Sequence, residues 1–435
     1  MTAQRQTWAV MGGGLLGMTI AHRLAQQGEK VILYEAADQV GGLASAWQLG
    51  TITWDRFYHV ILLSDRYTRS LLRELQLEQE IQWVETKTGF YSDGQLTSMS
   101  NLFEFLSFPP LTLLDKIRLG WTIFYASKLK NWKMLESQPV ADWLRKWSGS
   151  NTFEKIWLPL LRAKLGENYQ QTSAAFIWAT IQRMYAARKS GMKKEMFGYL
   201  PGGYGRILER YSQVLKDEKV QIHLEQRVQK IAAANHGAIR IDCQAGGHDV
   251  VDRVVITLPS PDILAMDLEL SAEERTKLGS IQYLGVVCAS LLLKKPLSQF
   301  YVTNITDPGF PFTGVIEMSA LVERKYFAGH SLVYLPKYVT PDDPILKYTD
   351  QEIQELFFPA LMRMHPELRP DDLVRFQVAR ARTVFALPTC NYSQTLPPVQ
   401  TATAGIYVLN SAHIVHGTLN VNETVKLAED FISHR

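Results

Sequence analysis

The chain has 435 residues, 46% of them hydrophobic and 20% charged, a balance typical of a globular protein of about two domains. Its net charge of +3, from 46 basic and 43 acidic residues, does not predict a nucleic-acid partner. Three cysteines without CxxC spacing argue against a disulfide framework or a structural zinc site and favour a reducing compartment.

The sequence carries no targeting or membrane-spanning pattern. Residues 1–7 are too few and too polar for a signal peptide. No apolar run reaches the roughly 20 residues that a membrane-spanning helix needs. We therefore expect a soluble, cytoplasmic protein that at most lies on a membrane surface.

The N-terminal segment has the spacing of a dinucleotide-binding motif. Residues 8–11 form a short apolar run that predicts a buried strand, and Gly-Gly-Gly-Leu-Leu-Gly follows directly at 12–17. In this G-x-G-x-x-G pattern Gly12 permits a tight turn and Gly14 lets the backbone approach a pyrophosphate. Gly17 lets the next helix pack closely on the sheet.

A helix and a second strand follow in the order that the motif requires. We expect the helix over residues 15–27, so that the free amides of its first turn, at Leu15 and Leu16, bind the phosphates. The strand at 31–34 ends in Glu35, roughly 20 residues after the glycines, where the motif has its ribose-binding acid. A carboxylate there accepts the ribose hydroxyls and disfavours the 2′-phosphate of NADP.

A glycine pair follows the acid, in the sequence Ala-Ala-Asp-Gln-Val-Gly-Gly-Leu-Ala-Ser at 36–45. This segment resembles the flavoprotein superfamily of amine oxidases, protoporphyrinogen oxidases, phytoene desaturases and UDP-galactopyranose mutase, which usually has G-G-R-x-x-S/T here. Leu43 replaces the usual arginine. The resemblance implies that the cofactor is FAD and that four residues of this turn bind it: Gly41, Gly42, Leu43 and Ala44.

Two segments in the middle of the chain continue the resemblance. Residues 220–231 resemble the family segment in which a valine, here Val228, meets the adenine through its backbone. Residues 252–259 resemble the family's D-x-V-V-x-T-x-P strand, which returns to the nucleotide-binding domain.

The C-terminal part resembles the same family. Residues 405–410 form an expected strand that ends in Asn410, which the resemblance places at the ribityl and pyrophosphate part of FAD. A helix follows, with Asn422 as its expected N-cap. The resemblance implies that Val421 and Asn422, at the start of this helix, face the pyrimidine edge of the flavin.

These motifs predict an α/β fold, a Rossmann-like FAD-binding domain with an inserted α+β substrate domain. The FAD-binding domain would comprise residues 1–63, 200–262 and 400–435. The substrate domain would comprise 64–199, which we expect to be mostly helical, and 263–399, which begins with expected strands.

One expected helix of the insertion has an apolar stripe. Leu114, Ile117, Trp121 and Phe124 recur at steps of three and four residues, among several lysines and arginines. Two interpretations are open: a domain helix with a solvated face, or a peripheral membrane contact.

Three side chains are candidates for the chemistry. The segment Asp-Arg-Phe-Tyr-His at 55–59 resembles the family's D-x-G-x-H, with phenylalanine in place of glycine, and predicts His59 over the flavin. Residues 157–166 hold Arg162 and Lys164 within an apolar segment, where each would face a substrate anion, the flavin or solvent.

Other polar groups give weaker indications. His413 and His416 lie in an expected loop near the flavin edge, and with no third ligand nearby we predict no metal site. Arg380 and Arg382 alternate on an expected strand, where they would face solvent or an acidic substrate.

The leading prediction is an FAD-dependent oxidase, dehydrogenase or desaturase that takes a hydride from an apolar or amine-bearing small molecule. One alternative is a non-redox flavoenzyme resembling UDP-galactopyranose mutase, which needs paired arginines for a nucleotide diphosphate. The other is a flavin-binding protein without catalysis.

Overall fold

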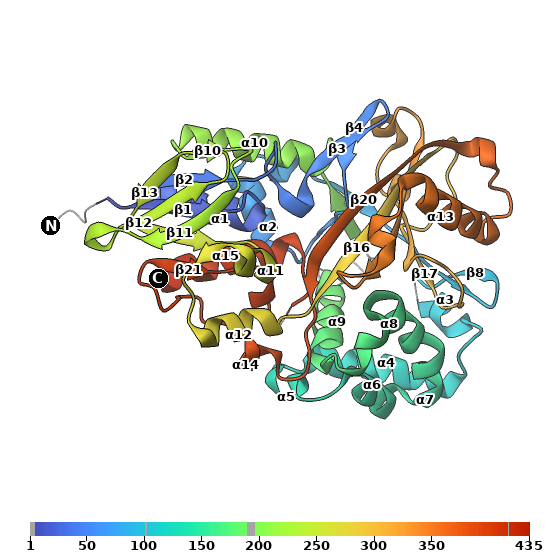
Figure 1. Cartoon of the computed structure of the whole chain (residues 1–435). Helices are drawn as coiled ribbons and strands as arrows, with labels where there is room; N and C mark the ends of the chain where they lie inside the picture. Colours follow the sequence, from blue (N-terminus) through green and yellow to red (C-terminus); the bar gives the residue numbers. More distant parts are fainter. Residues whose placement is uncertain (1–4, 101, 189–195, 416) are drawn as a thin grey trace.

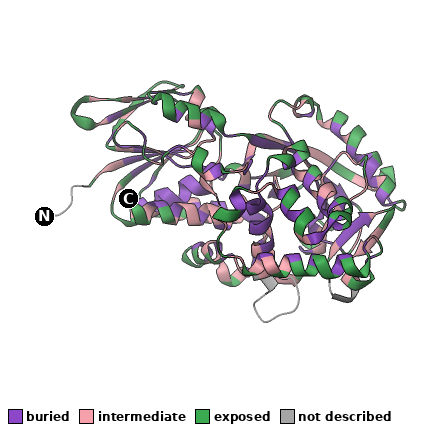
Figure 2. Ribbon diagram, turned by 90° about the horizontal axis from the view of Figure 1, so that it is seen from below, coloured by how far each residue is buried: buried purple, intermediate pink, exposed green. Residues whose placement is uncertain are grey.

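The computed structural model describes residues 5–100, 102–188, 196–415 and 417–435. Two lobes are visible in Figure 1: one contains both ends of the chain, and the other is built around the long strands β16 and β20. Buried residues line the sheets and the inner faces of the helices in both lobes, as Figure 2 shows.

The first lobe is centred on a parallel five-stranded sheet of the Rossmann type, in the order β10-β2-β1-β14-β21. Because all the strands are parallel, their carboxyl ends meet at one edge of the sheet, where such folds bind nucleotides. The strand bounds are β1 (Thr7–Met11), β2 (Lys30–Tyr34), β10 (Gln221–His223), β14 (Arg253–Ile256) and β21 (Ile406–Val408).

Each face of this sheet is covered by a different layer. Trp8 and Val10 pack against helices α1 (Leu15–Gln26), α10 (Gly203–Asp217) and α15 (Val421–His434). Ala9 and Met11 point the other way, because side chains alternate along a strand. They pack against a second sheet, in the order β13-β12-β11-β15, with bounds β11 (Val228–Ala233), β12 (Ile239–Cys243), β13 (His248–Val251) and β15 (Asp267–Leu268).

The second lobe contains a seven-stranded sheet in the order β20-β16-β19-β18-β17-β7-β8. Strand β16, between β20 and β19, is buried along its whole length, and α13 (Asp350–Met364) packs against the sheet. The bounds are β7 (Thr88–Ser92), β8 (Gln95–Ser98), β16 (Tyr283–Leu293), β17 (Val302–Ile305), β18 (Gly314–Glu317), β19 (Ser331–Val339) and β20 (Leu373–Ala386).

A group of helices lies beneath this sheet in Figure 1. Their buried side chains, among them Trp143, Phe153 and Trp178, form one hydrophobic core with residues of the sheet such as Leu284 and Phe385. The longer helices are α4 (Leu113–Lys128), α6 (Val140–Ser148), α8 (Leu158–Leu165) and α9 (Ala174–Arg188).

The predicted α/β class with a Rossmann-like sheet is confirmed. The strands of the parallel sheet come from three separate parts of the chain, each within a segment that we assigned to the FAD-binding domain. The domain boundaries themselves stay a prediction.

Candidate active site

A tight glycine turn joins β1 to α1. Gly12 has a φ of +104°, a conformation that residues with side chains rarely adopt. A methyl group at Gly12 would lie 2.6 Å from Thr257 Oγ1, and one at Gly17 would overlap the carbonyl oxygen of Gly12. The close approach of helix to turn therefore needs glycine at both positions.

The amino end of α1 is open. Gly14 is its N-cap, and no side chain of the described residues caps the first turn, whose amides include those of Leu15 and Leu16. Within the described parts of the chain, nothing lies within 4 Å of the place where a Cβ of Gly14 would be. These amides and the positive end of the helix dipole fit a pyrophosphate, which can take the place of the missing cap.

The glycine pair lies against this loop. The amide of Gly41 donates to the carbonyl oxygen of Gly13 at 2.7 Å, and a Cβ on Gly42 would lie 3.3 Å from the Cα of Gly14. Leu43 and Ala44 continue the turn as a short 3-10 helix over Gly42–Ala44, in which Leu43 is half-buried and Ala44 is buried.

Glu35 follows β2 at the same edge of the sheet. Its carboxylate accepts hydrogen bonds from the amides of Gly13 and Ala37, each at 2.8 Å. The amide of Gln226 donates to the carbonyl oxygen of Glu35 at 2.9 Å, which brings the start of β11, at Val228, close to the acid. The candidate ribose and adenine contacts therefore lie close together, although β2 and β11 belong to different sheets.

The C-terminal segment adds Asn410, just beyond β21. Asn410 is 1% exposed, its Nδ2 donates to the carbonyl oxygen of Leu258 at 2.8 Å, and its Oδ1 accepts from the amide of Ala412 at 3.0 Å. The side chain thus ties the loop after β14 to the loop after β21, at the carboxyl edge of the sheet.

The expected N-cap of α15 was wrong by two residues. Asn420 is the cap: its extended backbone lets its Oδ1 accept from the amide of Glu423 at 3.1 Å. Val421 is the first helical residue, and Asn422 lies in the first turn with its side chain directed away from the helix end. Its Oδ1 accepts from the amide of Tyr67 at 2.9 Å, in α2 (Arg66–Glu74).

A cavity of about 440 Å³ lies between α2, α9 and the start of α15. It is thus adjacent to the segment that resembles the flavin-edge region of the family. Six of its lining residues are Asp65, Tyr67, Trp178, Gln182, Asn420 and Asn422.

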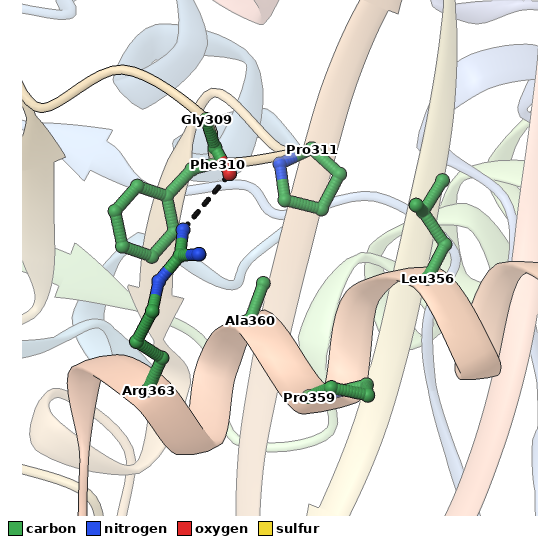
Figure 3. A pocket seen from close by; sticks show the side chains of 7 residues that line it. All are labelled: Gly309, Phe310, Pro311, Leu356, Pro359, Ala360 and Arg363. Carbon is green, nitrogen blue, oxygen red and sulfur yellow. Dashed lines mark hydrogen bonds between the residues drawn. The ribbon is translucent and has the colours of Figure 1, made fainter.

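A second cavity, of about 380 Å³, lies against α13 on the other lobe, as Figure 3 shows. Arg363 donates to the carbonyl oxygen of Gly309 at 2.8 Å and lies over the ring of Phe310 at 4.2 Å. Its charge is therefore already partnered, and none of the motif residues lines this cavity.

Asp55, which is buried, and His59, which is half-buried, form a pair of titratable groups. Asp55, at the end of β4 (Ile52–Asp55), accepts from the amide of Tyr204 at 2.8 Å in the first turn of α10. Burial raises the pKa of Asp55 to about 8. The Nδ1 of His59 lies 3.8 Å from Asp55 Oδ2, and burial lowers the pKa of His59 to about 4. His59 is therefore neutral near pH 7.

Aromatic side chains surround Lys164 and extend to Tyr58, the neighbour of His59 in sequence. The hydroxyl of Tyr58 lies 3.2 Å from that of Tyr338, and the Nζ of Lys164 lies 5.3 Å from the ring centre of Tyr338. The same Nζ lies 5.8 Å from the ring of Phe176 and 5.7 Å from that of Phe385. Lys164 is thus connected to Tyr58 through Tyr338, whereas the ring of His59 lies beside Tyr204 and Asp55. The catalytic roles of His59 and Lys164 stay predictions.

Arg162 lies elsewhere. It is exposed on α8, two residues before Lys164, and its Nε donates to Glu167 at 2.9 Å. This is the geometry of a surface ion pair, and among the described residues no contact joins Arg162 to His59 or to the rings around Lys164.

The remaining candidates have their own partners. Arg380 donates to Asp350 Oδ1 at 2.8 Å, and burial lowers the pKa of His413, whose Nδ1 lies 3.3 Å from the amide of Asn410. His416 lies outside the described residues. Within those residues, no group of three His, Cys, Asp or Glu side chains could hold a metal ion.

Three residues near the candidate side chains were not among our candidates: Asp55, Tyr204 and Tyr338. Asp55 belongs to the segment that pointed to His59 and could have been chosen with it. Tyr204 and Tyr338 come from distant segments with no motif of their own, so only the fold shows that they meet His59 and Tyr58.

The profile of the family described as "Flavin containing amine oxidoreductase" matches residues 17–420. The chain belongs to this family. Membership confirms the resemblance drawn from the glycine motifs and means that the cofactor is a flavin. The residues that would hold it fit the group, because the open end of α1, the glycine pair and Glu35 meet at the carboxyl edge of the parallel sheet.

The chain is similar to 15-cis-phytoene desaturases. That of Glycine max is 24% identical over 380 residues, which cover 80% of this chain and 65% of the relative. That of Synechococcus elongatus is 24% identical over 217 residues, which cover 44% of each protein. The chain therefore matches less than two thirds of the length of either relative.

Solved structures share the fold over nearly the whole chain. An oxidoreductase from Methanosarcina mazei has a TM-score of 0.75 at 17% identity, covering 98% of this chain and 100% of that one. A reduced UDP-galactopyranose mutase has a TM-score of 0.74 at 16% identity, covering 99% and 96%. In the described part of the chain, no helix is both long and apolar enough to cross a membrane.

Proposed function

We propose that this protein is an FAD-dependent oxidoreductase that takes a hydride from an apolar small-molecule substrate, as a desaturase or dehydrogenase does. The observation that carries the cofactor assignment is Glu35, whose carboxylate is bonded to the amide of Gly13 inside the phosphate-binding turn. An acid in that position suits the ribose of an adenine dinucleotide, so it favours FAD over a flavin mononucleotide.

When bound, FAD supplies the hydride acceptor. The chain supplies the binding surface and the exclusion of water. Aromatic residues around Lys164 provide an apolar wall, and the neutral His59, beside Tyr204, offers one polar group for orienting a ligand. The phytoene desaturase relatives, whose names point to an apolar polyene, support this type of substrate.

Lys164 favours an apolar substrate over an amine. A cationic amine binds well against aromatic faces, but here the ammonium group of Lys164 already lies over the rings of Phe176, Tyr338 and Phe385. Its positive charge would also repel a second cation. An uncharged substrate neither competes with Lys164 for the aromatic faces nor is repelled by its charge.

The mutase-like alternative has less support. It requires paired cations for a nucleotide diphosphate, whereas Arg380 is bonded to Asp350 and to the carbonyl oxygen of Tyr348. Breaking such a bonded pair would cost part of the binding energy.

The test is anaerobic reduction of the FAD-loaded protein by a linear polyene in detergent micelles, compared with a primary amine, followed by loss of oxidised-flavin absorbance. We expect the polyene to reduce the flavin and the amine to leave it oxidised. Reduction by the amine alone, or sugar isomer exchange only after dithionite treatment, would contradict the proposal.

Matched variants on one helix sharpen this test. Lys164→Met should slow reduction by the polyene at least about fivefold, because it changes the aromatic wall of the pocket. Arg162→Met, on the same helix at the surface, should leave the rate unchanged. Equal effects of the two substitutions would remove Lys164 from the pocket.

A further inference from the structure

Most of the exposed large apolar side chains of this protein lie in one place. Seven of the twelve in the described residues are on α4 or the segments beside it, and Leu113, Ile117 and Trp121 are 66%, 60% and 55% exposed. The other four are Leu106, Leu114, Phe124 and Met134. The remaining five exposed apolar residues are scattered over other elements: Leu224, Val250, Tyr348, Leu356 and Val374.

The geometry of α4 produces a continuous apolar stripe. Its exposed apolar residues recur at three- and four-residue steps, so they share one face, and the rings of Trp121 and Phe124 are 5.8 Å apart. The opposite face is buried through Leu119, Thr122 and Ala126 in the core that α4 shares with α6 and α9. The helix is therefore fixed in place, and no described residue covers its apolar stripe.

The charges around the stripe have one sign. Between residues 106 and 134 the exposed charged side chains are Arg118, Lys128, Lys130 and Lys133. The one acid in this range is Asp115, which is buried and accepts from the amide of Thr112 in the helix cap. We call this face, comprising Leu106 and the exposed residues of 113–134, the α4 face.

We propose that the α4 face docks on an anionic lipid bilayer, with α4 lying in the plane of the surface. An apolar stripe with aromatic residues, bordered by lysines, is the pattern of helices that bury one face in the lipid head-group region. The basic rim complements acidic lipids. A second copy of this chain would bring two basic rims together, so self-association through this face is disfavoured.

The docking face is directly connected to the cavity near α15. Trp178 Nε1 donates to the carbonyl oxygen of Leu129 at 3.1 Å, and Gln182 Nε2 donates to that of Ala126 at 2.8 Å. Both Trp178 and Gln182 also line the cavity of about 440 Å³. One layer of helix α9 thus separates the carboxyl end of α4 from the cavity, so docking would hold that cavity close to the lipid.

The experiment is co-sedimentation of the full chain with vesicles of phosphatidylcholine alone or with added phosphatidylglycerol, at low and high salt. We expect binding to the anionic vesicles that weakens as salt rises. Absence of binding to either vesicle type would overturn the proposal. Because this readout needs no substrate, it is independent of the proposed oxidoreductase activity.

Variants locate the contact. Ile117→Ser with Trp121→Ser should weaken vesicle binding at least about tenfold, because both apolar side chains leave the stripe. Lys128→Gln with Lys130→Gln should weaken it roughly fivefold per lysine at low salt. Val250→Ser with Leu356→Ser, exposed apolar residues of other elements, is the matched control and should bind like the unsubstituted protein.

Each variant is compared at equal flavin content and equal melting temperature, which exposed positions should preserve. If Ile117→Ser with Trp121→Ser binds vesicles as well as the control does, the α4 face is not the docking surface. If the same variant instead changes the protein from a dimer to a monomer without lipid, the occupant is a second copy and the lipid proposal is overturned.

Discussion

The amide of Gly41 donates to the carbonyl oxygen of Gly13 at 2.7 Å, and this bond joins two glycine motifs that are separate in the sequence. Gly13 also donates its own amide to Glu35, so one residue connects the phosphate turn, the glycine pair and the ribose acid. The three parts therefore form one rigid unit, in which a change to one glycine acts on the geometry of the others.

Gly14→Ala should weaken FAD binding without affecting the apoprotein. Its φ of −68° suits alanine, and nothing in the described structure lies near the added methyl group. That methyl would, however, occupy the space of a pyrophosphate, and an overpacking cost of about 1–3 kcal/mol weakens FAD roughly 5- to 150-fold. FAD titration tests the loss of affinity, and the melting temperature of the apoprotein tests whether its stability is unchanged.

Gly17→Ala is the contrasting control. Its methyl group would overlap the carbonyl oxygen of Gly12, so this substitution should lower the melting temperature of the apoprotein itself. If both variants destabilise the apoprotein equally, the space at Gly14 is not open, and the assignment of the amino end of α1 as the pyrophosphate site is wrong.

Glu35→Ala should lower FAD affinity roughly 10- to 150-fold, since bonds to a charged acceptor contribute about 1.5–3 kcal/mol. Asp38→Ala is the matched control, because Asp38 is an exposed carboxylate in the same loop. Isothermal titration of the two apoproteins with FAD measures the difference. An unchanged affinity in Glu35→Ala would show that another residue holds the ribose.

Local patterns predicted the strands, the glycine turn and the helix at this edge of the sheet, because these parts are short and contiguous. The glycines, the acid and the strands each depend on neighbours in sequence, and Val228 was found through a resemblance of the same local kind. The N-cap of α15 shows the limit: Asn420 and Asn422 have the same side chain, and only the backbone path shows which one caps the helix.

The surroundings of Arg162 and Lys164 were harder to predict. Arg162 and Lys164 are two residues apart on α8, so the helix turns them to different sides, and one meets Glu167 while the other meets aromatic rings. The rings come from α9, β19 and β20, which are distant in sequence. Contacts between residues so far apart in the sequence leave no local sequence pattern that could predict them.

Asp55→Asn should change how stability depends on pH. The pKa of Asp55 is raised to about 8 from its usual 3.8, so the folded chain keeps a proton that the unfolded chain releases. The stabilisation is fully present below pH 3.8 and is lost as the pH rises towards 8. The free energy of unfolding of the unsubstituted protein, minus that of Asp55→Asn, should fall by at most about 1.4 kcal/mol per pH unit in that window.

Chemical unfolding of both proteins at several pH values measures this difference. Asparagine keeps an oxygen that can accept from the amide of Tyr204, so Asp55→Asn should fold. A difference that stays constant from about pH 5 to about pH 8 would mean that Asp55 is ionised in the folded chain over that range and that its pKa is not raised.

His59→Ala should slow flavin reduction by substrate about tenfold while FAD content stays the same, because the loss of one buried polar contact costs about 1.4 kcal/mol. The pKa of His59 is lowered to about 4 by burial, so the group is neutral at physiological pH. The pH profile of the reduction rate should therefore have the same shape in the variant and the unsubstituted protein above about pH 5.5.

Anaerobic stopped-flow mixing with the substrate gives both rates. If the variant reacts at the unsubstituted rate, His59 is structural and the polar group of the pocket is to be sought at His413, whose ring lies against Asn410 near the flavin-edge segment.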